Sequence, residues 1–277
     1  MPRPAAKGRG RTPRRRAGGD ARPGSSAPRH DRDAGGPKKL LSAKAALRAR
    51  TWRALREVGA ARFPGAEGRI PNFAGAEAAA ERLRATDEWR RARTVKSNPD
   101  APQLPVRQRA LQDGKTLFMA VPRLAAERPF LRLDPGRLAV SPRAAASIRG
   151  AARAGKPVDV DALEPVDLVV TGCVAVAPDG ARLGKGGGFA DLEFAVAALA
   201  GLVGQRTVVA TTVHDAQVLP ARVIPRTAHD VRVDLVVTPT RVLRCRRGRR
   251  ARPAIRWNEL TEEKIAAVPL LARLRPR

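Results

Sequence analysis

The sequence predicts an α/β protein whose mainly parallel sheet is flanked by helices and preceded by a disordered basic tail. The stretches "KTLFMAV" (115–121) and "VDLVVTGCVAVA" (166–177) are continuously apolar, as is typical of strands buried on both faces. Segments with helical spacing and capping residues separate such stretches, and strands that alternate with helices build parallel sheets. A hydrophobic content of 43% is sufficient for a real core.

The first 39 residues are rich in Arg, Gly and Pro and have almost no large apolar side chains. Such a segment cannot bury enough surface to offset its ordering entropy, so we expect a disordered tail over 1–39 and one domain over 40–277. No apolar run approaches the roughly 20 residues of a membrane span. Cys173 and Cys245 form no CxxC pair. We therefore expect a monomeric cytoplasmic protein without membrane association.

The first half of the domain contains two expected helices and two expected strands. The stretch "LSAKAALRARTWRALREVG" predicts a helix that opens near Ser42 and ends near Gly59, with one face formed by Leu47, Thr51, Leu55 and Val58. A strand is expected at 93–97 and a loop, "NPDAPQ", at 98–103. The next helix covers 104–114, with a proline in its first turn and a glycine at its end. The apolar strand 115–121 follows.

The second half continues the alternation. Residues 141–155 predict one helix with Ser141 as its N-cap, Pro142 at N1 and Gly155 at its end. The buried strand 166–177 precedes a glycine-rich loop and another helix. Further strands are expected at 205–213 and 231–238.

The glycine-rich loop is the strongest functional signal. Four glycines and one lysine occupy positions 184–188, directly before an apolar helical run. The spacing fits neither the Walker A loop nor the GxGxxG fingerprint. Glycines let a backbone approach an anion closely, and a helix expected to start near Asp191 adds a positive dipole end. Arg182 and Lys185 add charge for phosphate oxygens. Phosphate binding is favoured, and a tight structural turn is the open alternative.

The net charge of +28 would attract polyanions, nucleic acid above all. We expect a nonspecific attraction through the basic tail and through a second arginine cluster at 241–257. A GC-rich coding sequence would also enrich arginine with no binding role, and composition does not separate these explanations. Aromatic residues are only 3%, so the stacking platforms of single-strand binders are missing.

Three segments resemble the 5-formyltetrahydrofolate cyclo-ligase family, also called methenyltetrahydrofolate synthetase. The stretch "RLGKGGGFAD" (182–191) resembles the family signature RLGxGxGYYD. "KAALR" (44–48) resembles the KxxLR of the family's first helix, and "VIPRTAHDVRVDLVVT" (223–238) resembles its late P-x-x-x-x-D-x-x-V-D segment. Phe189 and Ala190 replace the two tyrosines, which is closer to the divergent branch of methenyltetrahydrofolate synthetase domain-containing proteins.

The resemblance implies a site for ATP, Mg²⁺ and a folate. The family's Mg²⁺-associated acids correspond to Asp191 and Asp230, and a glutamate on its pterin side corresponds to Glu77. Phe189 would contact both ATP and folate, and the catalytic groups would be Lys44 and Arg182. The implied ATP-binding residues are Lys44, Arg48, Arg182, Leu183, Gly184, Lys185, Gly186, Gly187, Gly188 and Phe189.

The implied reaction is the ATP-dependent conversion of 5-formyltetrahydrofolate to 5,10-methenyltetrahydrofolate. Two other functions stay open: a catalytically inactive nucleotide- or RNA-binding protein, and an ATP-dependent enzyme acting on another folate-like substrate. Asn98 and Gln103 could bond a pterin edge, although an ordinary turn is the favoured explanation of their loop.

Overall fold

The computed structural model describes residues 36–276, apart from 122–123, 161–163, 228–229 and 247–254. The first 35 residues of the predicted tail and much of the second arginine cluster therefore lie outside the described residues. Within the described part of the chain, every helix is too short or too polar to cross a lipid bilayer.

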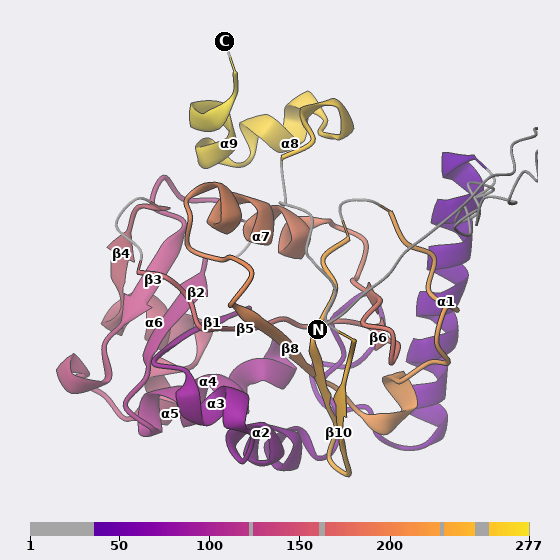
Figure 1. Ribbon diagram of the computed structural model, residues 1–277, viewed down its shortest axis with the longest axis horizontal. Helices are drawn as coiled ribbons and strands as arrows, with labels where there is room; N and C mark the ends of the chain where they lie inside the picture. The colour runs from indigo at the N-terminus through magenta and orange to yellow at the C-terminus, as the bar shows by residue number, and fades with distance from the viewer. Residues whose placement is uncertain (1–35, 122–123, 161–163, 228–229, 247–254, 277) are drawn as a thin grey trace, which may run out of the picture. The chain divides into compact units, whose positions relative to one another are not determined.

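A central sheet organises the domain, as the apolar strands predicted (Figure 1). Its order is β10-β9-β8-β5-β1-β2-β3-β4 among the described residues. The five strands from β9 to β2 are parallel, and β10, β3 and β4 pair antiparallel at the two edges. The strands are β1 Thr94–Ser97, β2 Thr116–Ala120, β3 Phe130–Leu133, β4 Lys156–Val158, β5 Leu168–Val170, β8 Val208–Thr212, β9 Leu235–Val237 and β10 Val242–Arg244.

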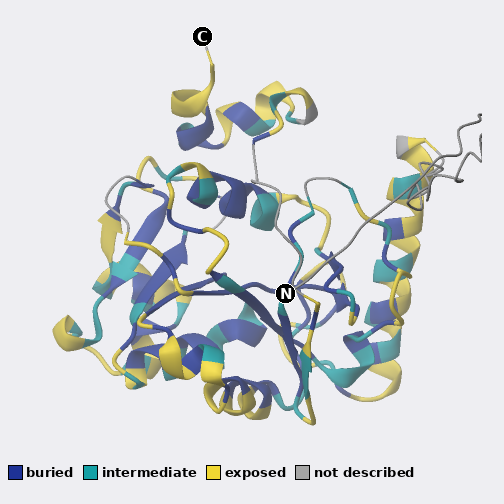
Figure 2. Ribbon diagram, in the orientation of Figure 1, coloured by how far each residue is buried: buried dark blue, intermediate teal, exposed yellow. Residues whose placement is uncertain are grey.

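Helices cover both faces of this sheet, and its central strands are buried (Figure 2). One face packs against α2 (Ala76–Arg84), α3 (Asp87–Arg91), α4 (Leu104–Gln112), α5 (Pro142–Ala145) and α6 (Ile148–Ala154). The other packs against α7 (Phe189–Leu199), α8 (Glu262–Ala266) and α9 (Pro269–Leu274). Alternation along β5 divides the two cores: Leu168 and Val170 join the first cluster and Val169 joins the second.

The helix α1 (Pro37–Glu57) lies beside a small second sheet, formed by β6 (Ala175–Val176) and β7 (Arg182–Leu183). Leu47 of α1 packs against the cluster that contains Leu183 and Ile224. This packing brings α1 close to the start of the glycine-rich loop.

Several predicted boundaries were wrong. The helix α1 begins at Pro37 instead of near Ser42, because Pro37 occupies its first turn, and Val58 is 59% exposed beyond its end. The predicted helix 141–155 is two helices, because the hydroxyl of Ser147 accepts from the N–H of Gly150 and caps a second start. The predicted strand 166–177 divides into β5 and β6. The helix α7 starts at Phe189, two residues before Asp191.

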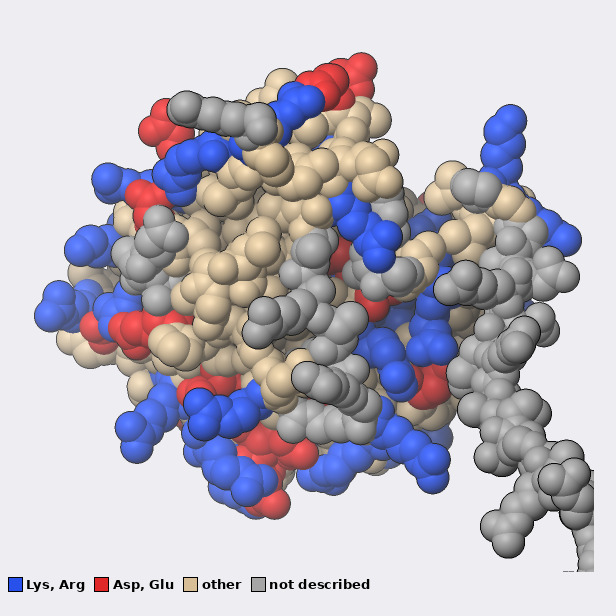
Figure 3. Space-filling view, turned by 45° about the horizontal axis from the view of Figure 1, so that its top comes forward, with Lys and Arg blue, Asp and Glu red and all other residues tan. Residues whose placement is uncertain are grey.

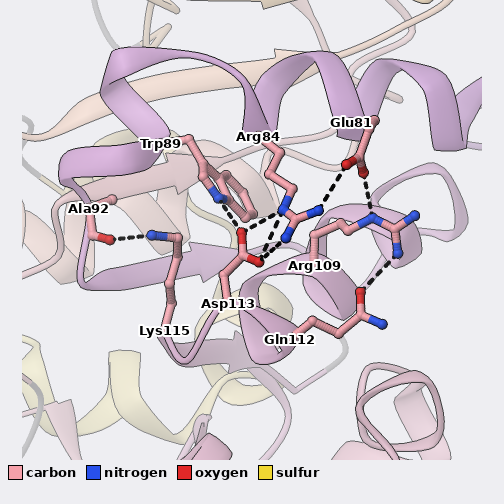
Figure 4. Close-up of polar contacts among 8 residues, drawn as sticks. All are labelled: Glu81, Arg84, Trp89, Ala92, Arg109, Gln112, Asp113 and Lys115. Atoms are coloured by element: carbon pink, nitrogen blue, oxygen red, sulfur yellow. Dashed lines mark hydrogen bonds and ion pairs between the residues drawn. The ribbon is translucent and has the colours of Figure 1, made fainter.

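A polar network holds the amino ends of β1 and β2 (Figure 4). Asp113 pairs with Arg84 at 2.6 Å and accepts from the indole N–H of Trp89 at 2.8 Å. Lys115 donates to the carbonyl of Ala92 at 2.6 Å. These contacts tie α2, α3 and α4 together at the end of the strands where the chain enters them. The carboxyl ends of these strands lie at the opposite edge, away from this network.

Candidate functional site

A cavity of about 250 Å³ lies at the carboxyl ends of the central strands. Asn98 and Asp100 line it just after β1, Ala120 lines it at the end of β2, and Gly172 lines it just after β5. The opposite wall is the glycine-rich loop and the start of α7. Ligands of parallel sheets bind at this end. The loop itself directly follows β7 of the small sheet.

The loop has the backbone conformation that its glycines predicted. Gly186 has φ 109° and Gly188 has φ 67°, values that side chains with a Cβ rarely adopt. Arg48 donates from Nε to the carbonyl of Gly184 at 2.7 Å. A Cβ at Gly186 would lie 3.6 Å from the Arg48 guanidinium carbon. The loop therefore lies directly against α1, and this contact places Arg48, which the resemblance assigned to ATP, beside the loop.

Lys44 and Arg182, which the resemblance assigned to ATP, form ion pairs with the two acids that it assigned to Mg²⁺. Lys44 Nζ lies 2.8 Å from Asp230 Oδ2, and both side chains are largely buried. Arg182 pairs with Asp191 and also donates from Nε to the carbonyl of Val231 at 3.1 Å. The structure thus brings residues from α1, the glycine loop and the segment before β9 to one place.

The two acids are linked through one stretch of backbone. Asp191 Oδ1 accepts from the N–H of Val231 at 3.1 Å, and Val231 directly follows Asp230. Asp230 also accepts from the N–H of Thr227 at 2.7 Å. Burial alone would raise the pKa of Asp230, but the hydrogen bonds from Lys44 and Thr227 outweigh burial and lower it. Asp230 is therefore an ionised carboxylate at neutral pH.

The described residues hold no group of three or more His, Cys, Asp or Glu side chains that could bind a metal ion by themselves. Asp191 lines the cavity, and its Oδ1 accepts from both Arg182 and Val231. Mg²⁺ commonly binds one or two carboxylates together with substrate phosphates. Asp191 and Asp230 fit that limited donor set.

Glu77, the residue matched to the pterin side, has no place at the cavity. It is exposed in the first turn of α2, whereas the residues that line the cavity come from other elements. Phe189 does line the cavity, at the start of α7, as does Ala190. The aromatic ring and the small neighbour thus take the positions of the two tyrosines in the family signature.

Sequence reasoning missed a buried ion pair below the cavity. Lys96 Nζ lies 2.7 Å from Glu193 Oε1, and each side chain is only 5% exposed. Asn98 donates from Nδ2 to Glu193 Oε2 at 2.8 Å, while its own Oδ1 is buried without a partner among the described residues. A lysine inside the buried strand "TVKS" and a glutamate inside the apolar helix "FADLEFAVAAL" are the signals that could have indicated this pair.

The loop "NPDAPQ" is more than an ordinary turn, because it forms part of the cavity wall. The buried guanidinium of Arg107 fixes it by donating to the carbonyl of Asn98 at 2.6 Å and to that of Asp100 at 3.0 Å. Burial lowers the pKa of Arg107 to about 10, against an opposing effect of Asp100. Gln103 Oε1 is buried without a partner in the described part of the chain, like Asn98 Oδ1.

Asp100 and Lys185 lie on opposite walls of the cavity. Burial raises the pKa of Asp100, the Lys185 ammonium opposes that rise, and the charge of Glu193 adds to it. The cavity therefore combines a cationic rim, at the glycine loop, with acceptor groups deeper inside. It could hold an anionic group at the loop and a polar, N–H-bearing group beyond it.

Comparison with known proteins identifies a family. A model of the 5-formyltetrahydrofolate cyclo-ligase family matches residues 40–239. Two curated relatives are both named methenyltetrahydrofolate synthase domain-containing protein. The Bos taurus protein is 39% identical over 234 residues, which are 83% of this chain and 61% of that protein. The Homo sapiens protein is 36% identical over 246 residues, which are 87% of this chain and 63% of that protein.

The chain thus spans about three-fifths of the length of the curated relatives it matches. Among solved structures, the 5,10-methenyltetrahydrofolate synthetase of Aquifex aeolicus aligns with a TM-score of 0.47 and 22% identity. That alignment covers 77% of this chain and 98% of the other.

Proposed function

The chain belongs to the 5-formyltetrahydrofolate cyclo-ligase family, and on that premise we propose that it closes 5-formyltetrahydrofolate to 5,10-methenyltetrahydrofolate. The reaction consumes ATP, requires Mg²⁺ and releases ADP and phosphate. One observation carries the proposal: the family's glycine loop lines a cavity at the carboxyl ends of the strands, with Lys44, Arg48 and Arg182 gathered beside it.

The proposed chemistry needs no protein nucleophile. The γ-phosphoryl group passes to the formyl oxygen and N10 attacks the activated carbon. The new C–N bond forms, N10 loses its proton to solvent, and the C–O bond breaks to release phosphate. The protein must then place the phosphoryl group against the formyl oxygen and neutralise its charge. Lys44 and Arg182 would supply that charge, while the loop from Leu183 to Phe189 would surround the phosphates.

Asp191 and Asp230 would hold Mg²⁺ together with the phosphate oxygens. Bound there, the ion would neutralise charge that develops on the transferred group. The folate would occupy the cavity beyond the loop, where Phe189 offers a ring and Asn98 lines the wall with a buried Oδ1 that has no partner among the described residues. We no longer assign Glu77 to this role, because it is exposed outside the cavity.

A binding protein without catalysis is the second candidate. Ala190 in place of a family tyrosine and the net charge of +28 favour it. Figure 3 shows Lys and Arg side chains around the rim of the face in view, with Asp and Glu side chains among them. An ATP-dependent enzyme with another folate-like substrate is the third, because the altered aromatic pair changes the cavity wall.

The test is methenyl formation by the purified full chain, followed by absorbance, with ATP and Mg²⁺. Lys44→Met should lower turnover by about two orders of magnitude, as the loss of one charge-stabilising donor does in other active sites. Lys38→Met is the matched control, since Lys38 is exposed on the same helix. Thermal unfolding of both variants would confirm that they fold.

The outcomes separate the candidates. Product formation that depends on Lys44 but not on Lys38 supports the cyclo-ligase. ATP binding without product favours one of the other two functions, and turnover of a different folate would then select the enzyme. Sequence-selective RNA binding that resists salt would promote the binding protein, because nonspecific binding weakens steeply with salt.

A further inference from the structure

The C-terminal segment 255–276 lies outside the matched residues 40–239, yet it packs against the helix that follows the glycine loop. Ile265, Val268 and Leu271 are buried in the same cluster as Leu192 and Val196 of α7. Figure 1 shows α8 and α9 on the α7 side of the sheet. This apolar contact fixes α8 close to the start of α7.

One side chain of α8 reaches the glycine loop. Lys264 Nζ donates to the carbonyl of Gly187 at 2.8 Å and lies 5.0 Å from the centre of the Phe189 ring. A Cβ at Gly188 would lie 3.1 Å from the same nitrogen. Lys264 therefore contacts three consecutive residues, all of which line the cavity.

The carbonyl contact orients the loop. In the trans peptide that joins Gly187 to Gly188, the carbonyl and the following N–H point in opposite directions. When Lys264 holds the Gly187 carbonyl, the Gly188 N–H is turned away from the C-terminal segment. Gly188 is also the N-cap of α7, where N–H groups and the helix dipole favour an anion.

The composition of the loop makes such a contact useful. Residues 185–188 are exposed, and three of the four are glycines, which lose the most conformational freedom when they are ordered. Arg48 holds the start of the loop, through the Gly184 carbonyl and beside Gly186, whereas Lys264 holds its end, through the Gly187 carbonyl. Burial lowers the pKa of Lys264 and the Asp191 carboxylate opposes that effect, which agrees with its place beside the loop.

We propose that Lys264 is a positioning residue of the nucleotide site, which holds the glycine loop in its anion-binding conformation before a phosphate arrives. The inference rests on the proposed function, because the anion is taken to be the phosphate chain of ATP. It extends the site beyond the family match, to a side chain that no segment of the resemblance includes.

The test compares Lys264→Met, Lys264→Arg and a control, Arg275→Met, in the full chain. Arg275 belongs to the same segment and carries the same charge, but it pairs with Glu262 instead of the glycine loop. Two quantities are measured: cleavage after Lys185 by a lysine-specific endopeptidase, without ligand, and ATP affinity by calorimetry. Thermal unfolding checks that each variant is folded.

Lys264→Met should speed cleavage and weaken ATP binding by about tenfold each, the factor expected for one charge-assisted hydrogen bond. Lys264→Arg should keep most of the resistance to cleavage and most of the ATP affinity, since a guanidinium can also donate a hydrogen bond and lie over a ring. Arg275→Met should leave both unchanged. If Lys264 acted only through its charge, Lys264→Met and Arg275→Met would change the cleavage rate and the ATP affinity alike. That result would overturn the proposal.

Unchanged cleavage in Lys264→Met would also overturn it, as would faster cleavage with unchanged ATP affinity. If the wild-type chain binds no ATP, the proposed function fails. The cleavage rates would then still decide whether Lys264 holds the loop, so the two failures can be told apart.

Discussion

The buried pair of Lys96 and Glu193 gives the sharpest test of the physical argument. Both side chains are 5% exposed, and their charged atoms lie 2.7 Å apart. Glu193→Gln would keep the size of the side chain and remove its charge, which leaves the Lys96 ammonium buried without a counter-ion. Breaking a buried pair in this way costs about 3–5 kcal/mol of unfolding free energy.

The matched control is an exposed pair. Glu262 and Arg275 lie 2.8 Å apart, but their side chains are 74% and 50% exposed. Because solvent screens such a pair, Glu262→Gln should leave the urea midpoint of unfolding almost unchanged. The assay is urea unfolding at pH 7. A loss below about 1 kcal/mol for Glu193→Gln would refute the reasoning, because it would mean that water reaches the pair.

A double variant shows whether the pair affects folate binding as well as the stability of the fold. Lys96→Met with Glu193→Leu removes both charges, so most of the lost stability should return, to within about 1–2 kcal/mol of the wild type. Asn98 would still lose the carboxylate that accepts from its Nδ2. The double variant should therefore be stable but bind folate weakly, with normal ATP affinity. Normal folate affinity would mean that the pair only stabilises the fold.

Three further changes test other parts of the site. Gly186→Val places a branched side chain at φ 109°, so ATP affinity, measured by calorimetry, should collapse while the fold persists. Asp191→Asn should lower turnover by orders of magnitude in the methenyl assay, and near-normal turnover at ordinary Mg²⁺ would contradict its assignment. Asp100→Asn should stabilise the protein at pH 7. Because burial raises the pKa of Asp100 in the folded state, its charge destabilises the fold above that pKa. The gain should disappear below about pH 4, where Asp100 is protonated in both states, and a gain independent of pH in urea unfolding would contradict this cause.

The sheet could be predicted because its central strands are buried on both faces and are therefore mostly apolar, β1 with its buried Lys96 being the exception. The edge strands could not. The strand β4 includes Lys156 and Pro157, both exposed, and β10 ends at the exposed Arg244, so neither has the pattern of a buried strand. Pro37, directly after Gly36, indicates a helix start before Ser42. The Gly-rich composition around it indicated a disordered tail instead, so the start of α1 was predicted too late.

The glycine loop could be located because its chemistry is local: glycines, a lysine and a helix start lie within a few residues. The residues below the cavity depend on contacts between distant segments. Asn98 and Glu193 are 95 positions apart, and only folding brings them together. The same limit explains Glu77, which was matched by its place along the chain and has no tertiary contact that could test that match. Lys264 was missed for this reason too.

The ion pairs at the site suggest why metal and nucleotide would bind together. Without ligand, Lys44 neutralises Asp230 and Arg182 neutralises Asp191. Phosphate oxygens of ATP would compete for both cations, and each carboxylate would then lose its partner unless another cation arrived. Mg²⁺ carried by the phosphates meets that need with only two protein carboxylates. Each ligand would thus raise the affinity for the other, by the same factor in both directions. The same exchange of partners bears on Asp191→Asn: in the ligand-free protein this change would leave the Arg182 guanidinium, whose side chain is only 3% exposed, without its carboxylate, so the variant should lose stability in urea unfolding as well as turnover.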